Sequence, residues 1–103
     1  MTKRRLQPDD RKQQILTAAI KVAGRPGGWS KLTRDAVAKE AGCAEGLVSK
    51  YFGTMITFRR SIMRAAIVAE NLAVVAQGLA AGDASAKKAD EGLKRKALET
   101  LAG

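Results

Sequence analysis

The stretch LTRDAVAKEAGCAEGLVSKYFG, residues 32–53, contains two short helical patterns separated by a glycine-containing break. Thr33 suits the N-cap of a helix over 34–41, because its hydroxyl can accept a hydrogen bond from a first-turn amide. Gly42 suits the left-handed position that follows such a helix. After a turn of three residues, a second helix is predicted over 45–52. Two helices in this spacing predict a helix-turn-helix arrangement.

Helices are also predicted on both sides of this stretch. Apolar residues at helical spacing predict a helix over 9–23, which a turn rich in glycine and proline ends. Trp29 is expected to fill the core beside this turn. Thr54 is expected to cap one long helix that is predicted from 55 to about 76, and a final helix is expected to begin at Asp83 or Ser85. The predicted fold is therefore all-α, with a three-helix helix-turn-helix head, a long fourth helix and a C-terminal helix.

Large side chains are scarce in this chain of 103 residues. Hydrophobic residues make up 46%, but 19 residues are alanine, and Phe, Trp and Tyr together number four. From Ile62 onward the long predicted helix is apolar on nearly every face, so it must be covered on several sides. We therefore expect a homodimer. The expected interface residues are Ile62, Ala66, Ala69, Leu72, Val75, Leu79, Leu93 and Leu101.

Positive charge is concentrated in the front half of the chain. The net charge is +9, with 13 Lys/Arg and 5 Asp/Glu in residues 1–60 but 6 and 5 in residues 61–103. A basic front half is typical of a module that binds a polyanion, although a basic surface that only keeps a protein soluble has the same composition. The expected organisation is a basic arm over 1–8, a helix-turn-helix domain over 9–54 and a helical dimerisation region over 55–103.

The composition disfavours several classes of site. The chain has no histidine and one cysteine, Cys43, which leaves neither a histidine-based catalytic or zinc site nor a disulfide framework. Cys43 is expected to act as a small, partly buried apolar residue. No apolar segment follows the basic start, and polar residues interrupt the longest apolar run, so neither a signal peptide nor a membrane span is expected. We expect no cofactor, and an enzyme is the weakest interpretation.

Three separated blocks, RKQQILTAAIKVAG, LTRDAVAKEAG and EGLVSKYFGT, resemble the N-terminal DNA-binding domain of TetR-family transcriptional repressors. The resemblance covers about residues 10–67 and keeps the order and spacing of the blocks. It implies that 34–41 and 45–52 form a helix-turn-helix, with 45–52 as the helix that enters the major groove. It also implies that double-stranded DNA is the partner.

Individual positions are expected to contact DNA. Lys50 could donate to guanine O6 and N7, while Thr54 would help to set the docking register through phosphate. The basic arm could reach an adjacent minor groove or form a solvated tail. The full set of expected DNA-contacting residues is Thr33, Arg34, Ala44, Glu45, Gly46, Leu47, Ser49, Lys50, Tyr51 and Thr54, with Lys3, Arg4 and Arg5 in the arm.

The chain departs from the family pattern in the expected contact region. Met55 stands where the family usually has a phosphate-binding lysine. Another cation is expected to replace that lysine: Lys50, Arg34, Arg59 or the basic arm. Serine and lysine stand in place of aromatic residues in the recognition helix, which should change the bases that are read. Glu45 either accepts a hydrogen bond from a cytosine amino group or faces solvent at the helix N-terminus.

Only about 35 residues follow the matched region, which leaves little room for the inducer pocket of TetR-family repressors. We therefore expect a compact plasmid- or phage-type regulator that binds no small-molecule ligand and acts in the bacterial cytoplasm on the nucleoid. The predicted function is repression by a homodimer bound to an inverted-repeat operator. Two other interpretations stay open: a sequence-indifferent architectural DNA-binding protein and a helical protein-interaction adaptor.

Overall fold

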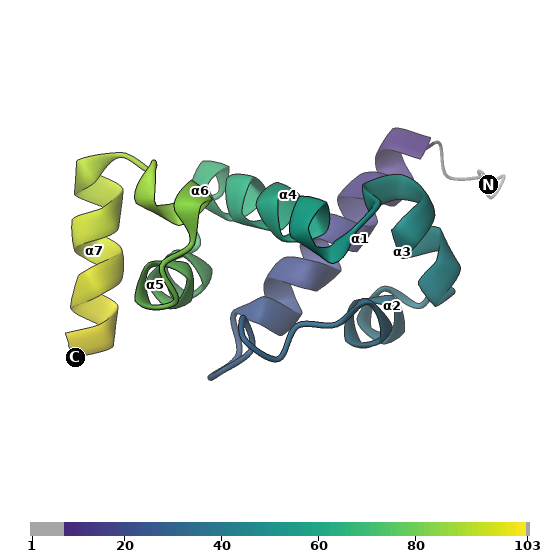
Figure 1. The fold of residues 1–103 in the computed structure, drawn as a ribbon, viewed down its shortest axis with the longest axis horizontal. Helices are drawn as coiled ribbons and strands as arrows, with labels where there is room; N and C mark the ends of the chain where they lie inside the picture. The colour runs from purple at the N-terminus through teal and green to yellow at the C-terminus, as the bar shows by residue number, and fades with distance from the viewer. Residues whose placement is uncertain (1–7, 103) are drawn as a thin grey trace, which may run out of the picture.

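All regular secondary structure in the described part of the chain, residues 8–102, is α-helical, as predicted. The computed structural model has seven helices and no strand in that range. Figure 1 shows α1, α2 and α3 at one end of an elongated molecule and α7 at the other, with α4 running between them. The principal extents are 46 × 27 × 21 Å. The helices are α1 (Pro8–Ala23), α2 (Arg34–Ala41), α3 (Glu45–Phe52), α4 (Met55–Val68), α5 (Leu72–Ala80), α6 (Ala84–Lys87) and α7 (Glu91–Ala102).

Four of these helices begin with the same capping device. The side chains of Thr33, Thr54, Asn71 and Asp83 each accept a hydrogen bond from the backbone amide three residues further on, with N···O distances from 2.9 to 3.2 Å. Such a cap satisfies one of the free amides of the first turn and contributes about 1 kcal/mol. The caps of α2 and α4 are those that the sequence predicts.

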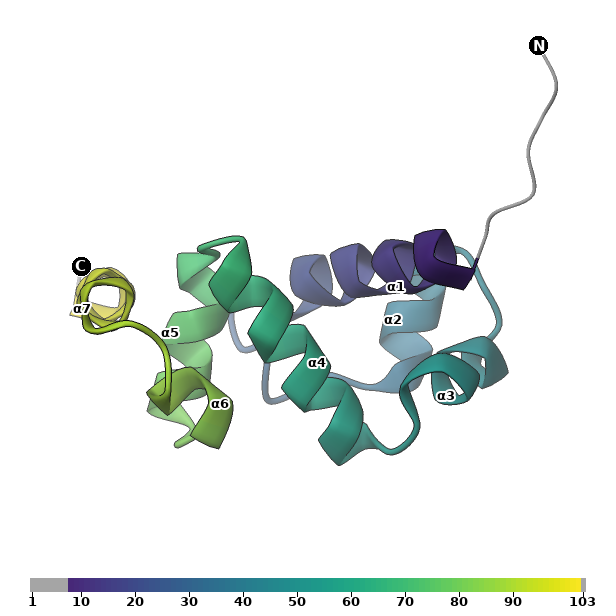
Figure 2. The same ribbon diagram turned by 90° about the horizontal axis from the view of Figure 1, so that it is seen from above.

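The prediction of one long helix over 55–76 is wrong, because the chain turns sharply after α4. Glu70 has a left-handed backbone with φ of 54°, and Asn71 then caps α5. The Asn71 amide donates to the Ala66 carbonyl at 2.8 Å, which closes the end of α4. The turn packs α5 against α4, as Figure 2 shows. The apolar segment is therefore covered in part by its own chain.

The predicted C-terminal helix is also divided in two. α6 ends at Lys87, and α7 begins at Glu91. Between them, Asp90 Oδ2 accepts hydrogen bonds from the amides of Gly92 and Leu93 at 3.0 and 3.3 Å. A carboxylate bonded in this way competes with continuation of the preceding helix and favours the start of a new one. α7 then packs along α5 at the far end of the molecule (Figure 1).

The core is a continuous cluster of buried side chains from α1 to α7. Phe58 is fully buried in it, and its ring centroid lies 4.9 Å from that of Phe52. Trp29 is only 4% exposed, which confirms the prediction that it fills the core beside the turn after α1. The rings of Phe52 and Phe58 thus pack where α1, α2 and α3, together called the head below, meet α4.

Half of the predicted dimer-interface residues belong to this core. Ile62, Ala66 and Val75 are fully buried, and Leu93 is 8% exposed. Their assignment to an interface with a second copy is wrong, because neighbours in the same chain already surround their side chains. The other four predicted residues stay accessible: Ala69 and Leu101 are exposed, and Leu72 and Leu79 are partly exposed.

Candidate nucleic-acid interface

The two helices predicted in residues 32–53 are present as α2 and α3, with the predicted bounds. Gly42 ends α2 with φ of 73° and ψ of 36°, a left-handed conformation that glycine adopts without steric cost. The amide of Cys43 donates to the Ala38 carbonyl at 3.0 Å. The amide of Gly42 donates to the Lys39 carbonyl at 3.3 Å, and the two bonds together form a helix C-cap of the Schellman type, which fixes the angle at which the chain enters α3.

α3 has a packed side and a free side. Val48 is fully buried and Phe52 is 9% exposed, so these residues hold α3 against the core. Three of the predicted contact residues, Gly46, Ser49 and Lys50, are exposed on the other side, and Glu45 is exposed in the first turn of the helix. Figures 1 and 2 show α3 at one end of the molecule.

The remaining contact residues predicted on α3 are less accessible. Leu47 and Tyr51 are partly exposed, and Tyr51 packs against the core. Lys50 Nζ lies 5.9 Å from the centroid of the Tyr51 ring. This distance is at the outer limit of a cation–π contact, which contributes about 0.5–1 kcal/mol at an exposed site.

The start of α2 is joined to the turn between α3 and α4. Arg34 is partly exposed, and its guanidinium donates to the Gly53 carbonyl at 3.3 Å. The capping residues Thr33 and Thr54, at the starts of α2 and α4, are both exposed. The structure therefore brings these three predicted residues to one edge of the head. Ala44, which is exposed, lies at the other end of α3.

Arg59, one of the cations suggested to replace the lysine absent at Met55, is hydrogen-bonded within the protein. Its guanidinium donates to the carbonyls of Trp29 and Leu32 at 2.7 and 3.4 Å. It also lies 5.0 Å from the centroid of the Trp29 ring, within the range of a cation–π contact. Arg59 thus ties α4 to the segment that leads into α2 and positions the head.

Glu45 occupies the first turn of α3 and is exposed. The N-cap, Ala44, offers no side-chain hydrogen bond to the amides of this turn. An acidic side chain at an uncapped helix N-terminus is stabilised by the positive end of the helix dipole. This explains the acid in terms of the protein alone, and an exposed carboxylate at this place is also free to meet a base edge.

A second charged group braces α2 against α1. Glu40, near the end of α2, lies 2.7 Å from the guanidinium of Arg25 and 3.5 Å from Lys21 Nζ. The hydrogen bond from Arg25 lowers the pKa of Glu40 below its ordinary value of 4.5, and Lys21 lowers the pKa further. These contacts pair one carboxylate with two cations on the side of the head where α1 meets α2.

Gln77 is a structural residue that the sequence pattern marks only as an interruption in an apolar run. Its Nε2 donates to the carbonyls of Ala23 and Arg25 at 2.7 and 2.9 Å, and its Oε1 accepts from the Trp29 amide at 2.9 Å. One side chain of α5 therefore holds the loop between α1 and α2. The signal available in the sequence is a lone amide within LAVVAQGLA, because polar groups in such surroundings need hydrogen-bond partners.

Three further observations concern the predicted arm, the length of the helices and the similarity of the chain to known proteins. Lys3, Arg4 and Arg5 of the predicted basic arm lie outside the described residues. Among residues 8–102, no helix has both the length and the apolar character that crossing a bilayer requires. Comparisons of the chain with protein-family models, with curated proteins and with solved structures find no match.

Proposed function

We propose that this protein is a sequence-specific DNA-binding transcriptional regulator that acts as a homodimer on an inverted-repeat operator. The observation that carries the proposal is the free side of α3. It presents Gly46, Ser49 and Lys50 to solvent in the basic front half of the chain, while Val48 and Phe52 pack against the core and hold the helix in place. A short, rigidly held helix with a polar outer side suits insertion into the major groove.

In this proposal each exposed group has a defined task. Lys50 donates to guanine O6 and N7, and the absence of a side chain at Gly46 lets the start of α3 come close to the bases. Thr33 and Thr54, at the edge of the head, contact phosphates through their exposed caps and set the docking register. Arg34 can support this edge while its guanidinium keeps its bond to the Gly53 carbonyl.

Two heads are needed because one three-helix head makes few base contacts. Specific protein–DNA interfaces bury on the order of 1,000–2,500 Å² of protein surface, which two heads supply more readily than one. A two-fold homodimer matches an inverted repeat, and occupation of a promoter by the dimer represses transcription by excluding polymerase. The half-exposed leucines of α7 supply apolar surface for such a pairing.

The proposal is tested by Lys50→Ala, with Lys96→Ala on α7 as a control that removes the same charge from an exposed position at the other end of the molecule. Dissociation constants are measured for a selected duplex and for a scrambled duplex over a range of salt concentrations. We expect Lys50→Ala to weaken binding to the selected duplex by about 1–3 kcal/mol and to relax preference at one base position in each half-site. Lys96→Ala should leave the preference intact. Equal weakening on both duplexes would place Lys50 on phosphate instead.

A second candidate function is sequence-indifferent DNA coating, which the excess of 13 basic over 5 acidic residues in residues 1–60 favours. Protection that spreads with protein concentration and ignores sequence would support coating against the main proposal. No detectable binding to any duplex at low salt would contradict both and favour a protein-interaction adaptor.

A further inference from the structure

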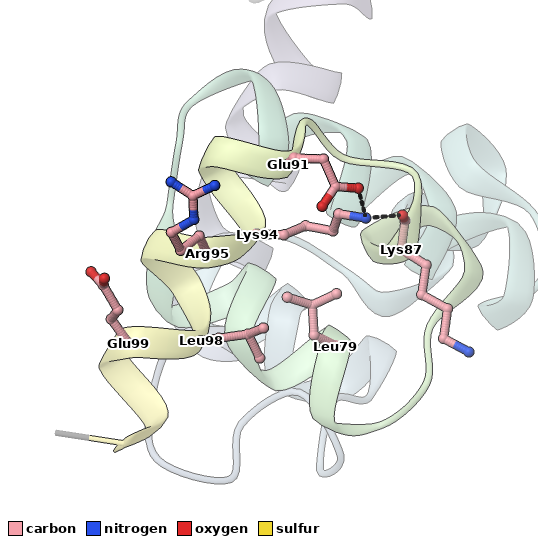
Figure 3. Close-up of a pocket in the computed structure, with 7 residues that line it drawn as sticks. All are labelled: Leu79, Lys87, Glu91, Lys94, Arg95, Leu98 and Glu99. Carbon is pink, nitrogen blue, oxygen red and sulfur yellow. Dashed lines mark hydrogen bonds and ion pairs between the residues drawn. The ribbon is translucent and has the colours of Figure 1, made fainter.

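An open groove of about 560 Å³ lies between α5, α6 and α7, at the end of the molecule away from α3. Figure 3 shows Leu79 of α5 and Leu98 of α7 facing one another across its floor. Leu98 is 50% exposed, and Leu101, one turn further along α7, is 52% exposed. These side chains form an apolar strip that the rest of the described chain leaves uncovered.

The rim of the groove carries charges of both signs. Figure 3 shows Lys94 between Glu91 and the carbonyl of Lys87, to which it bonds at 2.9 and 3.0 Å. Arg95 and Glu99 lie one helical turn apart on the outer edge of α7, with neither in an ion pair among the described residues. A rim with alternating sign suits a partner surface that also alternates, and it disfavours a polyanion.

We propose that the partner is α7 of a second copy, packed antiparallel with the two-fold axis at the level of Ala97. In an antiparallel pair related by this axis, residues whose numbers add to 194 lie at the same level along the helix axes, and those of them on the facing sides of the two helices meet. Arg95 then faces Glu99 of the second copy, and the same contact occurs again on the other side of the axis. The two Leu98 side chains lie within about 3 Å of each other along the helix axis, since the rise is about 1.5 Å per residue.

This inference rests on the proposed function in one respect, because the operator needs two heads. It identifies the surface that joins them, with Leu98 and Arg95 in place of the buried residues first assigned to the interface. α7 has 12 residues and is therefore only about 18 Å long, so the interface is small. We expect a dimer that dissociates in the micromolar range in solution and that two adjacent half-sites on DNA reinforce.

The decisive experiment exchanges charges between two variants of the full chain. Arg95→Glu and Glu99→Arg each place like charges across both symmetry-related contacts, so each variant alone should dissociate at least about tenfold more readily than the wild type. In an equimolar mixture every contact again joins opposite charges, and sedimentation equilibrium should show association restored to near the wild-type level. The double variant with both exchanges should also associate.

Mixing the two variants distinguishes repulsion between two chains from repulsion within one chain. In Arg95→Glu the new carboxylate also repels Glu91 and Glu99 of its own helix, and a second protein would leave that repulsion unchanged. Repulsion between chains, in contrast, is relieved in the mixture. Lys96→Glu, a charge reversal at an exposed position of the same helix that does not line the groove, is the matched control and should dimerise like the wild type.

The proposal is overturned if the mixture associates no better than its components, or if the wild type stays monomeric at several hundred micromolar. Restored association in a protein that binds no duplex would support the α7 interface and contradict the proposed function. If the protein binds DNA sequence-specifically as a dimer and neither charge reversal weakens that dimer, the result would support the proposed function and contradict the α7 interface.

Discussion

Replacement of Gln77 by alanine tests how the head is held to the rest of the molecule. The change removes three hydrogen bonds of 2.7 to 2.9 Å between α5 and the loop after α1. A typical intramolecular hydrogen bond contributes about 1 kcal/mol net, so Gln77→Ala should lower the free energy of unfolding by about 3 kcal/mol. For a domain of this size, such a loss lowers the melting temperature by about 12–24 °C.

Urea denaturation followed by fluorescence measures this effect directly, because Trp29 is the only tryptophan and its amide is one of the three donors. Gln13→Ala, at an exposed position of α1, is the matched control and should change the stability by less than about 0.5 kcal/mol. The proposed role of Gln77 is refuted if the two variants are equally stable. The loop leads into α2, so Gln77→Ala should also weaken duplex binding at temperatures where the protein stays folded.

Three further predictions concern stability. In Gly28→Ala the new Cβ would lie 2.2 Å from the backbone carbonyl oxygen of Val22, so the variant should lose about 3 kcal/mol. In Gly46→Ala the new Cβ would meet no atom within 4 Å, so the variant should gain about 0.5–1 kcal/mol of stability from helix propensity while its duplex binding weakens. Melting temperatures equal to that of the wild type would contradict the stability predictions for Gly28→Ala and Gly46→Ala. Glu40 has a lowered pKa in the folded state, so its contribution is complete at neutral pH and is lost as the pH falls below 4.5. The stability difference between wild type and Glu40→Gln, measured in urea, should close on acidification, and a constant difference from pH 7 to pH 3 would contradict the role of Arg25.

The local features of the head could be read from the sequence because each depends on residues close together in the chain. Thr33, Gly42 and Thr54 are capping residues whose partners lie within five positions, and the bounds of α2 and α3 follow from them. The burial of Trp29 follows from one large aromatic residue beside a glycine-rich turn.

The arrangement of the second half could not be read in the same way. The apolar side chains after Ile62 can be buried equally well by a second chain or by the same chain folding back, and the periodicity of the sequence does not distinguish these two arrangements. The chain folds back at Glu70 and Asn71, and asparagine is one of the residues favoured at a helix N-cap, the position that Asn71 holds at the start of α5. The partners of Gln77 lie 48 to 54 positions away, and no local pattern indicates contacts over that separation.

Among the candidate DNA-contacting residues, too, some features could be predicted from local spacing and others depend on distant contacts. Exposure of Ser49 and Lys50 follows from helical spacing once Val48 and Phe52 are assigned to the core. The role of Arg59 does not, because a guanidinium on α4 is equally suited to phosphate and to backbone carbonyls. Only the positions of the Trp29 and Leu32 carbonyls decide that it is bound within the protein.

Selection of duplexes from a random-sequence library by the purified protein tests the central claim most directly. We expect enrichment of an inverted repeat whose half-site centres lie about 10 base pairs, or a multiple of this distance, apart. Lys50→Ala should change the preferred base at the same position in both half-sites. Enrichment of no sequence, or an enriched sequence without two-fold symmetry that Lys50→Ala leaves unchanged, would contradict the claim that α3 reads DNA as one of a pair.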